Sequence, residues 1–370
     1  MPGNHQVVII TGAAGFLGSA ITVNLSHNYQ VVAIDRREPT ETLAAVAPNV
    51  IWQQVDIADE SALEDTFKKA RQSFGRIDFV VHLAAFYHFG LNWHPEYERT
   101  NLRGTANVLR SAMEAGVRRL IFSSSIAAMR PPPLGKVLTE RSPTIDYIPY
   151  GKSKRIGEDM VRHASNHLSS IILRIGGVFS DWCELPPLYS LIKLWAGRSP
   201  LSRIIVGQGH TGFPYIHRND VVKFVRNCIE RDEVIANHEV LFASDHGSVS
   251  HMDLFPIIHG ASMDRANVSP IFISPTIARF GLVLRLILGL VTQHLPYERP
   301  WMLQYVDHPW IVDTTYTQGK LGRSLTDRMG IRDRLPTIMK HFVQSRSVWE
   351  QRNRLRNKAL YSYSEDSTSQ

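Results

Sequence analysis

The sequence predicts an α/β fold: a doubly wound parallel sheet covered by helices on both faces, with a smaller, interleaved C-terminal lobe. In the first half of the chain, short apolar runs alternate with amphipathic stretches, as in sheets whose parallel strands are joined by helices. After about residue 176 this alternation stops, and prolines, tryptophans and irregular spacing take over. The expected buried strands are 7–11, 31–35, 50–55, 79–83, 119–123 and 170–175, and the clearest expected helices are 61–74 and 100–115.

The change of rhythm divides the chain. Residues 177–215 and 235–310 are irregular, and we expect them to close over the carboxyl ends of the strands, where such sheets bind ligands. No long linker separates the parts, so they are expected to pack as one compact unit. The predicted parts are a sheet domain at 1–176, a substrate lobe at 177–345 with some segments returning to the sheet, and a basic tail at 346–370 that is partly disordered, above all in its polar end 362–370.

The composition is that of an ordinary globular protein. The chain has 370 residues, of which 44% are hydrophobic and 20% charged, which excludes a disordered, collagen-like or disulfide-stapled chain. Its two cysteines, Cys183 and Cys228, indicate a reducing compartment. No secretory signal precedes the first apolar run, and we expect a cytoplasmic protein.

The net charge of +7 is concentrated near the C-terminus. Residues 346–358 hold five basic side chains and one acid, a net +4. This segment is either a solvated face or an amphipathic helix resting on an anionic membrane surface. The rest of the chain has neither a basic stripe nor a nucleic-acid recognition motif, so nucleic acid is not an expected partner. The sixteen histidines show no metal-ligand spacing, and no metal site is predicted.

A glycine-rich turn follows the first expected strand. Gly12, Gly15 and Gly18 recur at intervals of three in a strand–turn–helix context. Their missing side chains suit a sharp turn, close approach of a diphosphate to the backbone and close packing of helix on strand. The start of the helix would then offer its free N–H groups to the phosphates. This pattern predicts a Rossmann-type dinucleotide site, in which Phe16 and Leu17 of the same turn also contact the cofactor.

The second expected strand ends in an acid that indicates which dinucleotide binds. Asp35 is placed to accept hydrogen bonds from both ribose hydroxyls of an adenosine, and it would repel a 2′-phosphate. NAD is therefore the expected cofactor. Arg36 and Arg37 follow at once and would compensate a 2′-phosphate, so NADP stays an alternative.

Two further strand ends complete the predicted cofactor site. The third strand runs into Asp56 and Ile57, which are placed to hold the adenine. The fourth ends in small or apolar residues that leave room for the cofactor, with His82 packed beside it. These residues are Leu83, Ala84 and Ala85.

A tyrosine and a lysine supply the predicted chemistry. Tyr150 and Lys154 lie four residues apart and share one face of a helix. The run Ser123–Ser125 closes the fifth strand at the carboxyl edge. Oxidising a secondary alcohol requires a base beside the hydroxyl. A neighbouring ammonium lowers the pKa of a tyrosine enough for that task. Ser125 would donate to the substrate oxygen, and Lys154 would also bond the nicotinamide ribose.

These motifs resemble the extended short-chain dehydrogenase/reductase superfamily, of the NAD-dependent epimerase/dehydratase type. TGAAGFLG, HLAA, NLRGT, FSSS, YGKSK and LRIGGVFS stand in the expected order. The resemblance covers residues 6–225, including YIHRND, and continues faintly over 310–322. It implies that Ser125, Tyr150 and Lys154 are catalytic, that Ser123 lies at the cofactor, and that Asn101 supports the active site. Asn101 is also placed to cap a helix N-terminus, and the two roles are compatible.

The branch of the superfamily is indicated by two departures. Nucleotide-sugar enzymes usually carry V-Y-G after the active-site serine and an Asn-x-Tyr-Gly-Pro-like segment after the LR strand. This chain has residues 125–129, SIAAM, and 177–181, GVFSD, at those places. The S-S-I sequence resembles the 3β-hydroxysteroid and sterol-4-carboxylate dehydrogenases. That resemblance implies hydride transfer between NAD and a secondary alcohol or ketone of an apolar substrate that is sterol-, terpenoid- or lipid-like. A nucleotide-sugar epimerase or dehydratase and a non-catalytic NAD-binding redox sensor are the alternatives.

An apolar run in the C-terminal lobe points to the same substrate class. Residues 280–291 read FGLVLRLILGLV. Three interpretations stay open: a buried helix or lid lining an apolar pocket, an interfacial helix on a membrane, and a membrane span, for which the flanking charges are unfavourable. The expected partners are therefore an apolar small molecule and, as open alternatives, peripheral contact with a membrane and a homodimer.

Overall fold

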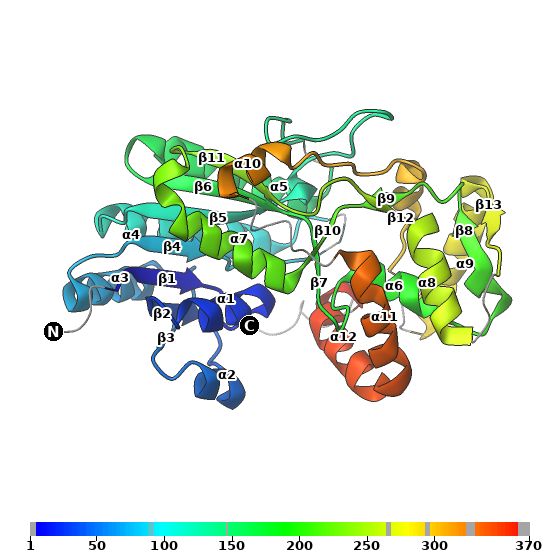
Figure 1. Ribbon diagram of the computed structural model, residues 1–370, viewed down its shortest axis with the longest axis horizontal. Coiled ribbons are helices and arrows are strands. Elements are labelled where there is room, and N and C mark those ends of the chain that lie inside the picture. Colours follow the sequence, from blue (N-terminus) through cyan, green and yellow to red (C-terminus); the bar gives the residue numbers. More distant parts are fainter. Residues whose placement is uncertain are drawn as a thin grey trace.

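The fold is built on a seven-stranded parallel sheet, as the alternating pattern predicted. The computed structural model describes residues 5–88, 90, 92–145, 147–263, 268–292, 297–322 and 330–361. The strand order is β11-β6-β5-β4-β1-β2-β3, and every neighbouring pair is parallel (Figure 1). The strands are β1 (Val7–Thr11), β2 (Gln30–Asp35), β3 (Ile51–Gln54), β4 (Phe79–His82), β5 (Arg119–Ser125), β6 (Ser169–Ile175) and β11 (Glu239–Ala243).

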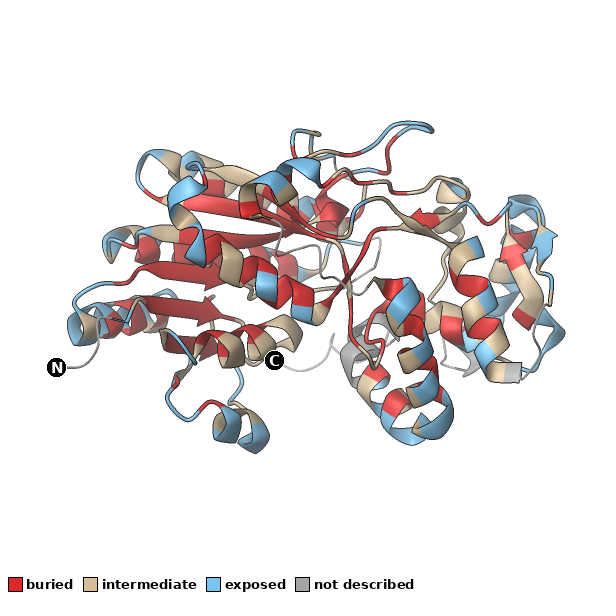
Figure 2. Ribbon diagram, in the orientation of Figure 1, coloured by how far each residue is buried: buried red, intermediate tan, exposed pale blue. Residues whose placement is uncertain are grey.

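Both faces of the sheet are buried, which explains the continuous apolar strands. In β1, Val8 and Ile10 belong to one hydrophobic cluster and Ile9 to the other, because successive side chains point to opposite faces. The first cluster includes side chains of α1 (Phe16–Leu25) and α7 (Arg218–Glu230). The second includes side chains of α3 (Glu60–Phe74), α4 (Thr105–Glu114) and α5 (Pro149–His163). Figure 2 shows the central strands as almost entirely buried between these layers. The edge strand β3 is exposed or half-buried along its length, so the expectation of a buried strand at 50–55 is wrong there, because an edge strand has a neighbour on one side only. The shorter helices α2 (Glu41–Val46) and α10 (Thr315–Leu321) lie at the margins.

The expected single helix over 100–115 is wrong in its first part. A π-helical stretch, η1 (Tyr97–Gly104), precedes α4. Such wider turns are rare and frequently occur at functional sites. Gly104 ends the stretch against Ile57, where a Cβ would lie 2.5 Å from the isoleucine Cδ1.

The C-terminal lobe has a core of its own. Its largest buried side chains include Trp195, Phe255 and Trp349. They come from α6 (Pro186–Trp195), α8 (His251–Met263) and α12 (Arg346–Tyr361), which pack with α11 (Ile331–Gln344). Two-stranded pairs complete the lobe: β7 (Gly177–Phe179) with β10 (Tyr215–His217), β9 (Gly212–Phe213) with β12 (Val249–Ser250), and β8 (Ile204–Val206) with β13 (Ile271–Ile273). The short 3-10 turns are η2 (Ile126–Ala128), η3 (Ala164–Asn166), η4 (Pro200–Arg203), η5 (Asp232–Val234) and η6 (Pro300–Tyr305).

The two parts are interleaved, because α7, β11 and α10 return to the sheet after the chain has entered the lobe. The division at 176 and 345 stays a prediction. The first half of α12 is anchored rather than loose: Trp349 is fully buried, and Asn353 accepts a hydrogen bond from the Glu184 backbone N–H at 2.8 Å. The expectation of a disordered end at 362–370 lies outside the described residues.

The apolar run 280–291 lies in α9 (Pro275–Thr292). Its side chains face solvent: Ile277, Phe280, Leu284 and Ile287 are 55–76% exposed. The interpretation as a buried helix or lid is therefore wrong. Within the described ranges no helix has both the length and the apolarity needed to cross a membrane, so the spanning interpretation is also wrong. The interfacial interpretation stays a prediction.

Candidate active site

The glycine turn leaves no room for side chains. Gly12 has φ +73°, and a Cβ there would lie 2.7 Å from the Ala84 nitrogen. A Cβ on Gly15 would lie 3.0 Å from the Gly12 carbonyl oxygen, and one on Gly18 would collide with that oxygen. The first glycine thus permits the left-handed backbone, and the third allows α1 to pack on the turn.

The start of α1 lies directly after the glycine turn. Phe16 and Leu17 are its first two residues, and its cap, Gly15, makes no side-chain hydrogen bond. The first turn contains no acidic residue. The positive end of the helix dipole therefore faces the turn, and α1 itself places no carboxylate in its first turn to compete with a bound diphosphate. The glycine turn and the start of α1 therefore fit the diphosphate of a dinucleotide.

Asp35 lies at the end of β2, beside this turn, and is buried. Its Oδ2 accepts a hydrogen bond from the Ala14 N–H at 3.0 Å. Its Oδ1 accepts from the Arg37 backbone N–H at 3.0 Å and from the Arg37 Nε at 3.1 Å. Arg36 instead extends toward Glu96, with 3.9 Å between Nη1 and Oε2. Arg37, rather than Arg36, is thus the arginine in contact with the ribose-binding candidate.

Asp56 and Ile57 follow β3 at the same edge. Arg99 binds the Asp56 carboxylate at 2.5 Å, and the Ala58 N–H donates to it at 2.9 Å. Burial raises the pKa of Asp56, but these donors outweigh that effect and hold the pKa below its usual value. Ile57 is buried, and its carbonyl accepts a hydrogen bond from the Asn107 side chain at 3.0 Å. The loop is therefore fixed by α4 and η1.

The chain continues beyond β4, opposite the glycine turn, through Leu83, Ala84 and Ala85. The Leu83 N–H donates to the Thr11 carbonyl at 3.2 Å, which continues the ladder between β4 and β1. His82 is deeply buried, with its ring nitrogens 2.7 Å from the Thr11 Oγ1 and 3.0 Å from the Thr105 Oγ1. Burial, with a contribution from the charge of Lys154, lowers its pKa to about 3, so the ring is neutral at physiological pH.

Lys154 lies beneath the serine run that ends β5. Its Nζ donates a hydrogen bond to the Ser123 carbonyl at 2.7 Å and stands 5.3 Å from the centre of the Phe122 ring. Burial lowers its pKa to about 8, although the charge of Glu158 opposes this. At neutral pH the site therefore holds a cation in a poorly solvated position, where its field acts strongly on neighbouring groups.

Ser125 and Tyr150 lie at the ends of β5 and α5, which pack against each other. Ser125 is the last residue of β5, and its Oγ accepts a hydrogen bond from the Ala127 N–H at 3.1 Å. Tyr150 is the second residue of α5. A Cβ on Gly151 would collide with the Ala127 carbonyl, so only glycine lets α5 start this close to the segment after Ser125. The ring of Tyr87 meets the Tyr150 ring edge-on, with 4.7 Å between centroids.

Asn101 connects two parts of the site. Its Oδ1 accepts from the Phe86 N–H at 2.7 Å, and its Nδ2 donates to the Phe86 carbonyl at 3.0 Å. The same amide donates to the Ser153 Oγ at 2.9 Å, and that hydroxyl donates to the Tyr150 carbonyl at 2.8 Å. Asn101 lies inside η1, so the expected capping role is wrong. Its side chain ties the loop after β4 to the first turn of α5.

A buried ion pair below Lys154 was not predicted. Glu158 accepts hydrogen bonds from Arg174 at 2.9 and 3.0 Å and from the Ser124 hydroxyl at 2.6 Å. Burial raises the pKa of Glu158, but Arg174, Ser124 and Arg162 together hold it below its usual value. The sequence carried a signal for it: Arg174 interrupts an apolar strand, and Glu158 lies four residues after Lys154 on the same helix face.

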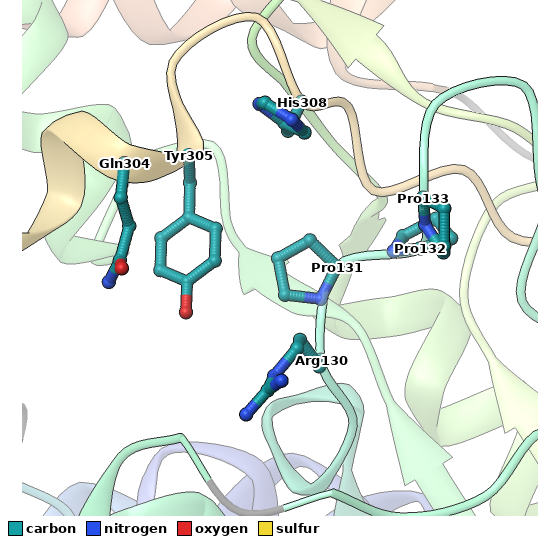
Figure 3. A pocket seen from close by; sticks show the side chains of 7 residues that line it. All are labelled: Arg130, Pro131, Pro132, Pro133, Gln304, Tyr305 and His308. Atoms are coloured by element: carbon teal, nitrogen blue, oxygen red, sulfur yellow. The ribbon is translucent and has the colours of Figure 1, made fainter.

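An open pocket with a volume of about 370 Å³ lies beside the segment that follows η2, and Ser125, Tyr150 and Lys154 are not among its lining residues. In Figure 3 the side chains of Arg130 and Tyr305 extend into the same open space. Tyr147, three residues before Tyr150, meets the Tyr305 ring at 5.8 Å and the Trp310 ring at 5.6 Å between centroids. Aromatic rings thus form a wall between the start of α5 and the pocket. The pocket is lined by Arg130, Pro131, Pro132, Pro133, Gln304, Tyr305 and His308.

Comparison with known proteins identifies the family. The profile of the NAD dependent epimerase/dehydratase family matches residues 8–241. The chain belongs to this family. Its expected cofactor, NAD, is confirmed as that of the family. In sequence the chain is 33% identical over 174 residues to UDP-glucose 4-epimerase 2 from Oryza sativa subsp. japonica, covering 44% of the chain and 41% of that protein.

A second relative belongs to the branch that the S-S-I sequence indicated. The chain is 27% identical over 198 residues to a 3 beta-hydroxysteroid dehydrogenase/Delta 5→4-isomerase from Monkeypox virus, covering 50% of the chain and 55% of that protein. The chain spans about half the length of these two curated relatives.

Solved structures of the family share the fold across nearly the whole chain. UDP-glucose 4-epimerase from Thermotoga maritima aligns with a TM-score of 0.68 at 19% identity, covering 92% of this chain and 99% of that one. The dTDP-glucose 4,6-dehydratase from Streptomyces venezuelae, solved with NAD, also aligns with a TM-score of 0.68 at 19% identity, covering 94% of this chain and 100% of that one. These likenesses extend the shared architecture to the C-terminal lobe.

Proposed function

We propose that this epimerase/dehydratase family member is an NAD-dependent oxidoreductase that transfers a hydride between the nicotinamide and a secondary alcohol or ketone of an apolar small molecule. The main support is the buried Lys154 ammonium, held 2.7 Å from the Ser123 carbonyl below the start of α5, where Tyr150 lies. A cation in this position has the sign needed to stabilise a tyrosinate.

In this proposal each site residue has a separate role. Bound NAD supplies the hydride acceptor or donor. The Ser125 hydroxyl donates a hydrogen bond to the substrate oxygen and holds it beside Tyr150. The Tyr150 hydroxyl accepts the proton that leaves the substrate, or returns it in the reverse direction. Lys154 lowers the pKa of Tyr150 and bonds the nicotinamide ribose. The glycine turn, Asp35, Asp56 and the small residues after β4 hold the cofactor.

The pocket supports an apolar substrate. Its lining includes three consecutive prolines and a tyrosine, with Arg130 as the cation among the described lining residues. A nucleotide sugar carries a diphosphate, which is usually bound by more than one positive group. An apolar molecule with a single oxygen function needs only that oxygen to be recognised, while proline and aromatic faces cover the remainder. A sterol-, terpenoid- or lipid-like alcohol is the proposed class.

A nucleotide-sugar epimerase is the second candidate, because the relative with the highest identity quoted above is a UDP-glucose 4-epimerase. An epimerase would use the same Tyr150 and NAD, so the identity of the substrate distinguishes the two candidate functions. A redox sensor that does not turn over is the remaining alternative, and the intact Tyr–Lys pair argues against it.

The deciding experiment exposes the protein to sterols, lipid alcohols, UDP-glucose and dTDP-glucose in turn. Thermal unfolding is followed with NAD and with NADP, and NADH absorbance is followed with each compound. We expect an apolar alcohol to raise the melting temperature and to reduce NAD. A rise with nucleotide sugars alone, without net NADH formation, would favour the epimerase.

A further inference from the structure

Helix α9 presents an apolar stripe to solvent. Ile277, Phe280, Leu284 and Ile287 recur at spacings of three and four residues, which places them on one side of a helix. Their exposed fractions are 61%, 76%, 60% and 55%. Side chains of this size seldom gather on an exposed surface unless the surface binds something apolar.

The opposite side of α9 makes the contact with the lobe. Ala278 and Gly289 are buried there, and Leu282 and Leu286 are half-buried between them. These residues attach the helix to the lobe, so the apolar stripe on the opposite side faces solvent. Ile271 and Phe272 of β13, and Leu201 of η4, are also 44–58% exposed. Figure 1 shows β13 and α9 together at the end of the lobe away from the sheet.

The charges around the stripe are positive. At 100° per residue, Arg279 and Arg285 lie on the two flanks of the stripe. Residues 268–292 contain no Asp or Glu. Arg285 is 3.4 Å from Glu298, which lies outside this segment. Near η4, Arg198 is exposed, and Arg203 is half-buried with its guanidinium donating to the Ser269 carbonyl. An apolar stripe flanked by arginines is typical of a helix that lies in the interface of an anionic bilayer.

We propose that the α9 stripe docks the protein on an anionic membrane surface. The charge pattern favours a membrane over a second copy of the chain. In a two-fold dimer the stripes would face each other and bring the flanking arginines of both copies together. Glu298 pairs with Arg285, but residues 268–292 offer no carboxylate to pair with Arg279. Lipid phosphates pair with arginines on both flanks at once.

The basic C-terminal segment is a weaker candidate for the same role. Arg346 is 2.9 Å from Glu350, and Arg352 is 2.8 Å from Glu184. Pairing with carboxylates does not distinguish these guanidinium groups from Arg285, which pairs with Glu298. The difference is that α12 buries its Trp349 completely, whereas α9 presents its large apolar side chains to solvent. The docking surface is therefore assigned to α9.

Docking at α9 bears on how substrate arrives. Helix α9 packs against η6, whose Gln304 and Tyr305 line the pocket. A docked molecule would hold this pocket wall close to the lipid, so an apolar alcohol would reach it without crossing water. This extension rests on the proposed function, whereas the docking itself does not.

The test is co-sedimentation of the full chain with vesicles of phosphatidylcholine alone or mixed with phosphatidylserine. We expect binding to the mixed vesicles, weakened by salt, and at least tenfold weaker binding by the double variant Phe280→Glu, Leu284→Glu. Val46→Glu is the matched control, because Val46 is 54% exposed on α2, and it should bind as the wild type does. An unchanged melting temperature shows that the variants fold.

Two results would overturn the proposal. One is wild-type protein that stays in the supernatant with both vesicle types, including the case where α9 variants break a dimer seen by light scattering. The other is a double variant that still binds as the wild type does. Neither measurement uses a substrate, so the outcome is independent of the reaction. If the double variant slows turnover of a vesicle-dissolved alcohol but not of a water-soluble one, the delivery role is supported as well.

Discussion

Replacing Lys154 with methionine should make the protein more stable at neutral pH while removing its activity. Burial lowers the pKa of Lys154 from the usual 10.5 to about 8, so the folded state bears a penalty for holding the ammonium. At about 1.4 kcal/mol per pKa unit, that penalty is about 3 kcal/mol. Methionine fills a similar space without charge but loses the hydrogen bond to Ser123, worth about 1 kcal/mol. The expected net gain at pH 7 is about 2 kcal/mol.

The pH dependence gives this prediction a sharp signature. Below pH 8 both folded and unfolded states hold the proton, so the penalty is complete. Between about pH 8 and 10.5 the unfolded state binds more protons than the folded state, and the stability of the wild type rises with pH. The advantage of Lys154→Met should therefore shrink across this range and change sign before its upper end, because the wild type recovers about 3 kcal/mol and the initial advantage is about 2 kcal/mol.

The assay is thermal unfolding of the cofactor-free protein at several pH values from neutral to strongly alkaline. Lys152→Met is the matched control, because Lys152 lies on the same helix but is exposed, and it should show no pH-dependent gap from the wild type. The reasoning fails if Lys154→Met melts lower than the wild type at pH 7, or if the gap between them stays constant as pH rises.

Three further predictions concern the supports of the site. Gly18→Ala forces a Cβ into the Gly12 carbonyl and should weaken NAD binding at least tenfold in calorimetry, while Gly260→Ala, where the space is open, should not. Glu158→Gln leaves the Arg174 guanidinium buried without its carboxylate and should lower the free energy of unfolding by about 3–5 kcal/mol in urea titrations; a loss below about 1 kcal/mol would contradict the described pairing. Asn101→Ala removes the two hydrogen bonds to the Phe86 backbone and the one to the Ser153 Oγ, and should lower the free energy of unfolding by about 2 kcal/mol. It should also lower kcat more than it raises KM. An unchanged kcat would refute a role of Asn101 in positioning Tyr150.

The sheet was predictable because its strands are buried on both faces. Val7–Thr11 is an unbroken apolar run, and the expected and observed bounds of β1 coincide. β5 extends to Ser125, two residues beyond the strand core expected at 119–123, and the serine run closes the strand as expected. β11 was not assigned, since its five residues lie within an irregular region and join the sheet only by tertiary contact. The local hydrophobic pattern identifies a strand within a regular alternation, but it does not show that a later segment such as β11 rejoins the sheet.

The sequence predicted those site residues whose positions follow from the end of a strand or from helical spacing. Those rules put Asp35 and Ser125 at strand ends and Tyr150 and Lys154 on one helix, as the structure has them. They do not reach contacts between distant segments, such as the ion pair of Glu158 with Arg174. For the apolar run of α9 the sequence left burial, a membrane interface and a membrane span open, because hydrophobicity alone does not say what covers an apolar helix.

The central claim is that Tyr150 performs proton transfer next to bound NAD. The most direct test compares wild type with Tyr150→Phe in NADH formation from an alcohol found in the substrate screen, together with NAD affinity by calorimetry. The account predicts a loss of turnover of about 10²–10⁴-fold, with the Kd for NAD changed less than threefold, because only the hydroxyl that carries the proton is removed. A variant that retains more than a tenth of wild-type turnover would contradict it.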